Sequence, residues 1–420
     1  MTGKLKYRSL RGMPDVLPEN AALMSWAEGK AREVFRVFGY EEIRTPLLEE
    51  TEVFTRSIGE DTDIVEKEMY SFSDRGGKSV SLRPEGTASV IRAYIEHGWH
   101  KEADLVKLFY AGPMFRGERP QKGRLRQFHQ IGAEIIGGSD PYIDAELIFN
   151  LDVLLRTLEV DDFTILLNSL GCVKDRERYK KALSAYLEKK MSRLCDDCKR
   201  RAGTNVLRVL DCKREGCRDV VKNAPGVLDH LCGECLKDYE TLKKVLSDAG
   251  VSFREKKDMV RGLDYYTRTI FEVVHPALGS QDAIAAGGRY DNLTEQMGGP
   301  DVGATGYAIG LERLFLIIGK KGVPPARAGV LVIPVEEKAR MEAFRITRHL
   351  RISGVPSEMD HSGRSLKGQM RKAHKEGRRF VILLGEDEIR EARVLVKDME
   401  AGEQKELSLD EATVYLKEKL

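Results

Sequence analysis

Apolar residues near the start of the chain follow helical spacing and then give way to an extended stretch. One apolar face steps by four, four, three and four residues and consists of Leu23, Ala27, Ala31, Val34 and Phe38. Asn20 is a suitable N-cap residue, and Gly39 is suited to the C′ position. The pattern predicts a long amphipathic helix, followed by an extended stretch over 42–48 that contains Pro46.

The next part of the chain alternates β-rich runs with helical segments. Two β-rich runs, 105–110 and 128–136, flank a polar and basic loop at 116–126, which is too short for a crossover helix. We therefore predict two antiparallel strands. Further on, the pattern predicts a helix at 141–158, a charged and helix-rich segment at 176–250, a strand at 267–274, a glycine-rich turn at 287–288, and a strand followed by a helix at 306–318.

Pro324 and Pro325 break the chain where the pattern changes, and this predicts a linker. Beyond it, strands alternate with helices, in a pattern typical of a small α/β domain with a mostly parallel sheet. The expected elements are strands at 330–333 and 379–384 and helices at 336–353 and 365–375.

Composition narrows the class of protein without fixing its partners. The 420 residues are 41% hydrophobic and 32% charged, with a mean hydropathy of −0.38. These values exclude collagen-like and disordered proteins. Membrane proteins are excluded because no apolar run approaches the length that spans a bilayer. No secretory signal is visible, so we expect a cytoplasmic protein without a membrane partner. The net charge of +2 argues neither for nor against nucleic acid binding.

All seven cysteines lie between Cys172 and Cys235. An odd number confined to one segment indicates an inserted module rather than a disulfide framework. Two CxxC pairs, Cys195/Cys198 and Cys232/Cys235, are separated by 33 residues and are candidate ligands for a structural Zn²⁺. Cys212 and Cys217 lie between the pairs and could also serve. Reduced cysteines that pack between helices remain the alternative.

The chain contains no G-x-x-x-x-G-K-[ST] loop, and no G-x-G-x-x-G opens a helix after a strand. Any nucleotide must therefore be held by side chains, and arginine suits phosphate oxygens because its planar fork binds them bidentately. Three arginines stand out by context: Arg116 at the end of an apolar strand, Arg261 before Gly-Leu-Asp-Tyr-Tyr, and Arg313 at a helix start.

Three regions resemble the class-defining motifs of class II aminoacyl-tRNA synthetases. The helix and strand ending at Pro46 resemble the first motif, residues 115–118 with 126–128 the second, and residues 310–313 the third, in matching order and spacing. Longer blocks narrow the resemblance to the histidyl-tRNA synthetase family over nearly the whole chain. They are Leu82-Arg83-Pro84-Glu85-Gly86-Thr87, Arg126-Gln127-Phe128-His129-Gln130, Arg261-Gly262-Leu263-Asp264-Tyr265-Tyr266 and Ala286-Gly287-Gly288-Arg289-Tyr290-Asp291.

The resemblance implies an α+β catalytic core built on an antiparallel sheet, with a helical insertion and a C-terminal α/β domain. On this reading, 1–170 is the first part of the catalytic core, 171–255 the cysteine-containing insertion, 256–322 the second part of the core, and 326–420 an anticodon-binding domain. It also implies a homodimer, because the first motif forms the dimer interface in this family.

The resemblance further implies a histidine–tRNA ligase and assigns residues to the histidine substrate. Glu85, Thr87 and Gln130 would bind the ammonium, with Gly86 beside them. Glu134 and Tyr266 would recognise the imidazole, with Tyr265 next to them. Glu134 is four residues after Gln130 on a strand of period two, so both side chains can reach one pocket.

For ATP, the resemblance assigns the α-phosphate to Arg116, the terminal phosphates to Arg313 and the charge that develops at the α-phosphate to Arg261. Arg116 and Arg261 would also border the histidine. Mg²⁺ bound to ATP is expected, with Glu118 or Glu312 approaching it only indirectly. Gln121 and Arg126 match positions that would read the acceptor end of the tRNA, which carries an extra 5′ guanosine in this family.

A basic run in the last domain falls where the family binds the anticodon, which favours contact with the RNA backbone. Its members are Arg364, Lys367, Arg371, Lys372, Lys375, Arg378 and Arg379. The alternative function is that of a catalytically inactive paralogue that serves as a regulatory subunit of ATP phosphoribosyltransferase. That paralogue usually lacks the anticodon domain and some catalytic positions, whereas this chain keeps them.

Overall fold

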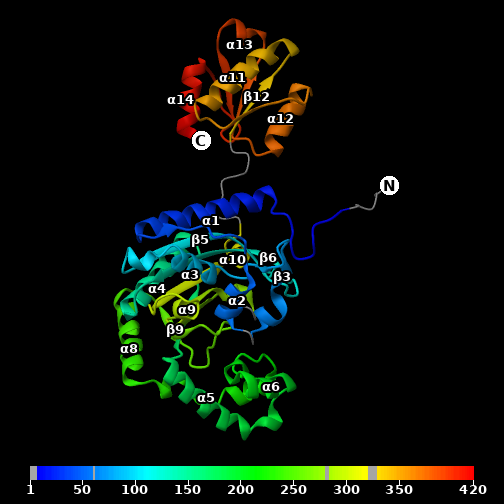
Figure 1. The fold of residues 1–420 in the computed structure, drawn as a ribbon. Coiled ribbons are helices and arrows are strands. Elements are labelled where there is room, and N and C mark those ends of the chain that lie inside the picture. Colours follow the sequence, from blue (N-terminus) through cyan, green and yellow to red (C-terminus); the bar gives the residue numbers. More distant parts are fainter. Residues whose placement is uncertain (1–6, 60–61, 280–282, 320–328) are drawn as a thin grey trace. The chain divides into compact units, whose positions relative to one another are not determined.

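The computed structural model describes residues 7–59, 62–279, 283–319 and 329–420. The chain divides into two compact units, Met1–Lys321 and Gly322–Leu420 (Figure 1). The boundary between the units falls in the segment that contains the predicted linker at Pro324 and Pro325, and those two prolines lie outside the described residues.

The first unit is built on an eight-stranded sheet with the strand order β1-β5-β6-β11-β10-β9-β7-β8. Every pairing from β5 through β7 is antiparallel, and only the edge pairs β1–β5 and β7–β8 are parallel. The prediction of an antiparallel core is confirmed. The strands are β1 (Glu41–Glu42), β5 (Val106–Phe115), β6 (Gln127–Ile136), β11 (Ala304–Gly310), β10 (Ala283–Arg289), β9 (Thr267–Val274), β7 (Thr164–Ser169) and β8 (Phe253–Glu255).

Two long helices, α1 (Pro18–Val37) and α4 (Pro141–Thr157), pack on each other and on this sheet. The ring of Phe35 on α1 stacks on that of Phe109 on β5, with centroids 4.5 Å apart. Asn20 is not the cap of α1, because the helix begins at Pro18, whose fixed φ suits the first helical turn.

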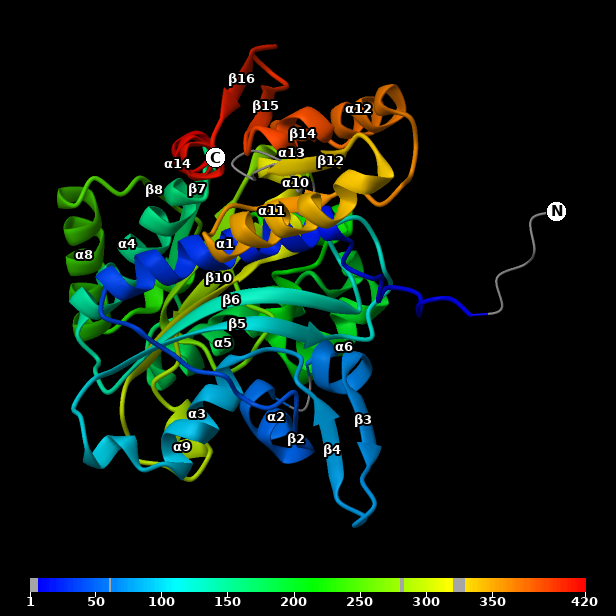
Figure 2. The ribbon, with the colours of Figure 1, turned by 90° about the horizontal axis from the view of Figure 1, so that it is seen from above.

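A second group of elements covers the edge of the sheet near β5 and β6. The helices α2 (Thr51–Ile58), α3 (Thr87–Glu96) and α9 (Leu293–Gln296) contact one another there (Figure 2). A small sheet of order β2-β4-β3 lies beside them, formed by β2 (Leu48–Glu50), β4 (Ser79–Leu82) and β3 (Tyr70–Ser73). Because successive strand residues point to opposite faces, Leu108 and Tyr110 join a core cluster with Ile91 of α3, away from Phe109 and its partner on α1.

The predicted turn at Gly287 and Gly288 is wrong, because both residues lie inside β10. The glycines serve close approach instead: a Cβ on Gly287 would lie 2.3 Å from the carbonyl oxygen of Gly306 on the neighbouring strand. Gly288 has φ +155° next to a β-bulge at Arg289.

The insertion consists of two helices of 16 residues and several shorter ones, and the segment from α5 to η5 has a core of its own. Its helices are α5 (Val173–Glu188), η3 (Met191–Arg193), α6 (Asp196–Thr204), η4 (Val206–Val209), α7 (Glu215–Val221), η5 (Val227–His230) and α8 (Gly233–Asp248). In Figure 1, α5 and α6 lie beyond β9, whereas α8 packs on α4. Leu183, Val209 and Val220 are among the buried side chains that pack together there, with Cys198 and Cys217 between them.

The second unit holds a five-stranded sheet of order β13-β12-β14-β15-β16. The sheet is mixed rather than mostly parallel, since β12 pairs in parallel with β13 and β14, whereas β15 and β16 pair antiparallel. The strands are β12 (Val330–Pro334), β13 (Ser357–Met359), β14 (Phe380–Leu384), β15 (Val394–Asp398) and β16 (Gln404–Leu407). The helices are η7 (Glu337–Ala339), α11 (Arg340–Ile352), α12 (Leu366–Lys375), α13 (Glu386–Arg390) and α14 (Leu409–Lys419).

Three short helices and one further helix complete the first unit: η1 (Ile64–Glu68), η2 (Trp99–Lys101), η6 (Pro276–Leu278) and α10 (Leu311–Ile318). Among the described residues, no helix has both the length and the apolar character needed to cross a membrane.

Candidate active site

A cavity of about 1340 Å³ opens between the large sheet and the insertion. Its core side carries most of the side chains that the sequence singles out: Glu85, Thr87, Arg116, Glu118, Gln130, Arg261, Tyr265, Tyr266, Glu312 and Arg313. The opposite wall comes from the insertion and includes Leu210, Cys212, Lys213 and Arg218. The cavity therefore gathers residues that are more than two hundred positions apart in the sequence.

Glu85 lies just before the first turn of α3 and is buried there, at 4% exposure. Its carboxylate accepts the backbone N–H groups of Thr87 at 2.6 Å and Ala88 at 2.9 Å. Burial raises the pKa of the Glu85 carboxyl, and these backbone N–H groups oppose that shift. The arrangement holds a carboxylate at the cavity surface, where it can accept a cation.

The turn that carries Glu85 is fixed by a buried arginine and by a glycine. Arg83 donates from Nε to the carbonyl oxygen of Pro113 at 2.9 Å and from Nη1 to Thr45. Gly86 does not line the cavity. It leaves room for Tyr110, because a Cβ on Gly86 would lie 2.3 Å from that ring.

Glu134 lies behind the cavity wall rather than at its surface. Its side chain is fully buried, and Thr87 donates its hydroxyl hydrogen to Glu134 Oε1 at 2.7 Å. Tyr290 and Tyr110 also donate to this carboxyl. Burial raises the pKa of Glu134 to about 8, against the lowering effect of these three hydrogen bonds. Glu134 therefore acts on the cavity through Thr87, whose hydroxyl is left to accept hydrogen bonds there.

The raised pKa of Glu134 predicts a pH-dependent difference in stability. The unfolded carboxyl titrates near 4.5 and the folded one near 8, so the stability that its protonated form contributes is present below pH 4.5 and lost as the pH rises through 8. We expect the Tm of Glu134→Gln, relative to the unchanged protein, to rise from about pH 5 to about pH 8.5. Thermal unfolding without substrate measures this, and a difference constant over that range would contradict a raised pKa.

Arg261 and Gln130 each present a buried polar atom without a partner. Arg261 donates from Nη1 to Glu272 Oε1 at 3.2 Å, and its guanidinium lies over the ring of Tyr266 at 5.8 Å. Among the described residues, nothing hydrogen-bonds to Arg261 Nε or to Gln130 Oε1, and both residues line the cavity. A buried donor and a buried acceptor left open in one cavity indicate that a polar ligand completes them.

Arg116 and Arg313 approach the cavity from the second-motif loop and from α10. Arg116 donates from Nε to the carbonyl oxygen of Pro84 at 2.9 Å and stacks over Phe128 at 5.3 Å. Arg313 donates to the carbonyl oxygens of Gly123 at 3.2 Å and Ala283 at 2.7 Å. These contacts orient the guanidinium groups of both side chains at the cavity wall.

The loop between β5 and β6 is a closed turn. The backbone groups of Gln121 and Arg124 bond to each other, Gly123 takes φ +73°, and Arg126 donates its N–H to the carbonyl oxygen of Gly12 at 2.7 Å. The structure places Gln121 and Arg126 outside the cavity lining, whereas Gly123 and Arg124 belong to it. Neither of the two residues predicted to read the tRNA is therefore part of the cavity wall.

Several residues that hold the predicted site residues in place were not predicted from the sequence. Glu272 pairs with Arg261, and Tyr290 and Tyr110 surround Glu134. Tyr290 lies in the block 286–291, and Tyr110 ends a predicted strand. The sequence therefore drew attention to both positions but did not indicate that both tyrosines contact Glu134.

The structure does not bring the four predicted zinc ligands together. Cys195 and Cys198 form a cluster with Cys212 and Cys217, whereas Cys232 and Cys235 lie in a separate group with Cys172 and Asp175. The long segment between the two CxxC pairs folds back on itself through α6, η4 and α7, so the pairs end in different places.

Part of the basic run in the second unit is engaged internally. Lys372 pairs with Asp360 at 3.1 Å, Arg379 pairs with Asp398 at 3.2 Å, and Arg378 is buried with Glu358 and Glu376. The exposed members are Arg364, Lys367, Arg371 and Lys375. The last three are four residues apart on α12, which places them on one face of that helix.

Comparisons with known proteins agree with the geometry of this site. A family model described as histidyl-tRNA synthetase matches residues 12–314, and a model described as anticodon binding domain matches residues 329–419. A histidine–tRNA ligase of Halothermothrix orenii is 48% identical over 96% of this chain and 97% of its own length. One from Thermodesulfovibrio yellowstonii is 47% identical over 99% of both chains.

Solved structures give the same result. The crystal structure of apo S. aureus histidyl-tRNA synthetase has a TM-score of 0.81 and 33% identity, over 98% of this chain and 100% of that one. A Bacillus halodurans structure titled as an ATP phosphoribosyltransferase regulatory subunit/histidyl-tRNA synthetase has a TM-score of 0.67, over 90% of this chain and 98% of its own, and at 21% identity it shows the fold alone. The family models and the near full-length relatives show that this chain belongs to the histidyl-tRNA synthetase family.

Proposed function

We propose that this chain is a histidine–tRNA ligase. It would activate histidine with ATP to form histidyl-adenylate and pyrophosphate, and then transfer the histidine to the 3′ end of its tRNA. The observation that carries the proposal is the cavity itself, which combines a buried carboxylate, two open polar atoms on Gln130 and Arg261, and three arginines in a chain of this family.

The ammonium of histidine needs a carboxylate and neutral acceptors, because a buried cation must be paired and hydrogen-bonded. We assign these roles to Glu85, to Gln130 Oε1 and to the Thr87 hydroxyl. Since Thr87 gives its hydrogen to Glu134, its oxygen presents lone pairs to the cavity. Glu134 is thus a positioning residue in this proposal.

The imidazole would lie against Tyr265 and Tyr266, whose rings are 4.6 Å apart at the cavity wall. Their hydroxyls offer hydrogen-bond partners that an apolar side chain cannot use. A site built in this way rejects such side chains, because its own buried polar groups would be left without partners. That penalty discriminates histidine from apolar amino acids.

Activation needs no covalent intermediate with the enzyme. A carboxylate oxygen of histidine attacks the α-phosphorus, and the bond from that phosphorus to the bridging oxygen of pyrophosphate breaks. Arg116 and Arg261 would stabilise the charge that develops on the α-phosphate, and Arg313 would hold the terminal phosphates. In the second step, a hydroxyl of the terminal ribose attacks the acyl carbon and AMP leaves.

The Mg²⁺ that accompanies ATP fits this site only as a partner of the phosphates. Glu118 and Glu312 line the cavity, but Glu118 pairs with Arg124 at 3.0 Å, and Glu312 accepts the backbone N–H of His129 at 3.0 Å. Both carboxylates are therefore engaged, and we assign them indirect contact with the ion, which supplies charge neutralisation to the phosphates.

The exposed basic face of α12 is the part of the second unit that we assign to the RNA backbone. It carries Lys367, Arg371 and Lys375 in a domain whose family model is described as anticodon binding. Because tRNA is the substrate, we place the reaction in the cytoplasm.

Charging of unfractionated tRNA with labelled amino acids tests the function. We expect the purified protein to charge tRNA with histidine, in an ATP-dependent reaction, and with no other amino acid. Failure to charge any tRNA would contradict the ligase and favour the regulatory paralogue.

We also propose that the chain acts as a homodimer through the region of the first motif. The support is apolar exposure at Leu47 and Leu48, each 43% exposed, and at Phe72, 50% exposed on the neighbouring small sheet. Light scattering should give a mass twice the 47.3 kDa of one chain. Leu48→Asp should shift the mass toward one chain, whereas Leu236→Asp, at a matched exposure of 44% on α8, should not. A monomeric unchanged protein would contradict the proposal.

A further inference from the structure

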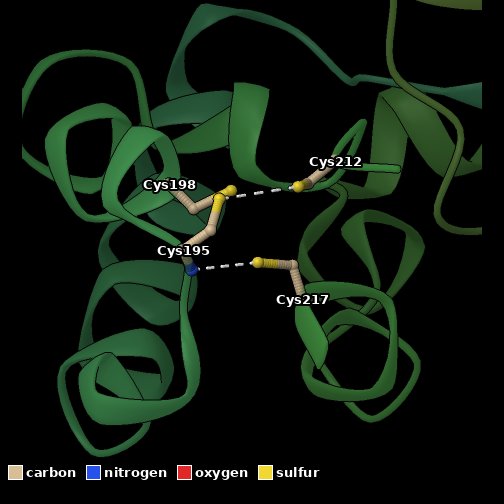
Figure 3. A group of neighbouring side chains, drawn as sticks. All are labelled: Cys195, Cys198, Cys212 and Cys217. Atoms are coloured by element: carbon tan, nitrogen blue, oxygen red, sulfur yellow. Dashed lines mark hydrogen bonds between the residues drawn. The ribbon is translucent and has the colours of Figure 1, made fainter. Parts of the chain in front are cut away.

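Four cysteine side chains in the insertion point into one shared space. Cys195 and Cys198 approach from one side, and Cys212 and Cys217 from the other (Figure 3). All four sulfur atoms lie within 4.8 Å of one another, and the Sγ atoms of Cys195 and Cys212 are 3.9 Å apart. All four residues are free cysteines.

These distances suit one tetrahedral metal ion. With Zn–S bonds of about 2.3 Å, the sulfurs of a tetrahedral site are about 3.8 Å apart, so the cluster needs only a small contraction to bind Zn²⁺. The spacing is also compact. Within each pair, two and four residues separate the cysteines, and 13 residues lie between Cys198 and Cys212. This interval is close to that of compact zinc modules, unlike the 33 residues that separate Cys198 from Cys232.

The surroundings of the cluster explain why a metal would be useful there. The segment from η3 to η5 consists of helices of nine residues or fewer, and it contains no described strand. Such short helices bury little apolar surface, and small modules of this kind commonly depend on a metal or a covalent link. The backbone N–H of Cys195 already donates to Cys217 Sγ at 3.2 Å, as expected around a ligating thiolate.

The charge around the cluster and the access to it are also compatible with a bound metal ion. Four thiolates on Zn²⁺ carry two net negative charges, because binding releases four thiol protons. An open hollow of about 420 Å³ beside the cluster is lined by Cys195 and Cys212, by the basic side chains of Arg201, Lys213 and Arg214, and by the acidic side chains of Asp197 and Asp211. It offers a path for the ion, and its basic side chains outnumber its acidic ones by one.

From this geometry we propose that Cys195, Cys198, Cys212 and Cys217 bind a structural Zn²⁺. The ion ties α6 to the segment 210–218, which forms the insertion wall of the large cavity through Leu210, Cys212 and Arg218. The proposal does not depend on the function assigned above, because it concerns how this wall is held.

The second cysteine group is different and serves as an internal control. Asp175 there already accepts the backbone N–H groups of Cys172 at 3.3 Å and Cys232 at 3.0 Å, and it pairs with Arg178. Its carboxylate is thus engaged in capping two helix starts, and we assign no metal to this group.

The zinc content of the purified full-length chain tests the proposal. We expect one zinc ion per chain, loss of that zinc in Cys212→Ser and Cys217→Ser, and retention in Cys232→Ser. Absence of zinc from the unchanged protein, or its loss in Cys232→Ser together with retention in Cys212→Ser, would overturn the proposal.

Replacing the zinc of the unchanged protein by Co²⁺ gives a second test, which does not require any cysteine variant to fold. We expect the visible absorption of tetrahedral Co²⁺ and a thiolate charge-transfer band with the intensity of four ligands. Loading of the Cys232→Ser protein should give the same spectrum. An octahedral spectrum, or a charge-transfer band with fewer than four thiolates, would overturn the assignment.

Discussion

Replacing Arg261 by alanine is expected to lower the rate of histidine-dependent ATP–pyrophosphate exchange by about 10²- to 10³-fold, the size of effect seen when one donor to a developing charge is removed. The guanidinium is held by Glu272 and Tyr266 and presents an open buried Nε at the cavity. Because its role lies in the transition state, kcat should fall more than the KM for histidine rises.

Two variants separate this role from a loss of stability. Arg261→Lys keeps the charge but not the planar fork, so it should recover only part of the rate. Arg92 lies on α3, pairs with Glu49 at 2.6 Å and is not among the cavity-lining residues. Arg92→Ala should therefore leave the exchange rate near its normal value. Equal losses in Arg92→Ala and Arg261→Ala would show that the effect is structural.

Replacing Glu85 by glutamine is expected to lower kcat/KM for histidine by about 10²-fold or more, since breaking a buried charge pair costs about 3–5 kcal/mol. The loss should appear mainly as a higher KM, because the ammonium is bound in both the ground state and the transition state. Steady-state exchange over a range of histidine concentrations measures both constants.

Glu68 offers a matched control for Glu85. It is a second cavity-lining glutamate whose pKa is raised by burial, and it has no assigned contact with histidine. Glu68→Gln should leave the KM for histidine nearly unchanged. A Glu85→Gln enzyme with a normal KM would contradict the ammonium assignment.

Local patterns in the sequence predicted the elements that depend on neighbouring residues. The β5–β6 pair and most of the apolar face of α1 follow from spacing and proximity alone and are present, although Phe35, and not the predicted Phe38, completes the buried face. The conformation of the blocks around Glu85 and Arg261 depends mainly on residues within each block. The residues that these blocks contribute to the cavity could therefore be identified as candidates from the sequence. Their roles toward histidine and ATP stay predictions.

Features that depend on packing between distant segments were not predictable in this way. Gly287 was predicted to lie in a turn, but it lies in a strand, where its lack of a Cβ allows the backbone of β11 to approach closely. Glu134 has strand spacing that places it with Gln130, but Thr87 covers it. The two CxxC pairs look alike in sequence, and only the path of the short helices between them decides which cysteines meet.

ATP–pyrophosphate exchange with each of the twenty amino acids is the sharpest test of histidine activation in this cavity, because the reaction proceeds without any contact with tRNA. We expect exchange with histidine alone, and in Arg261→Ala a rate lower by about 10²- to 10³-fold. Exchange with a different amino acid would contradict the assignment of Glu85, Gln130 and the tyrosine pair to histidine, and no exchange with any amino acid would contradict the ligase itself.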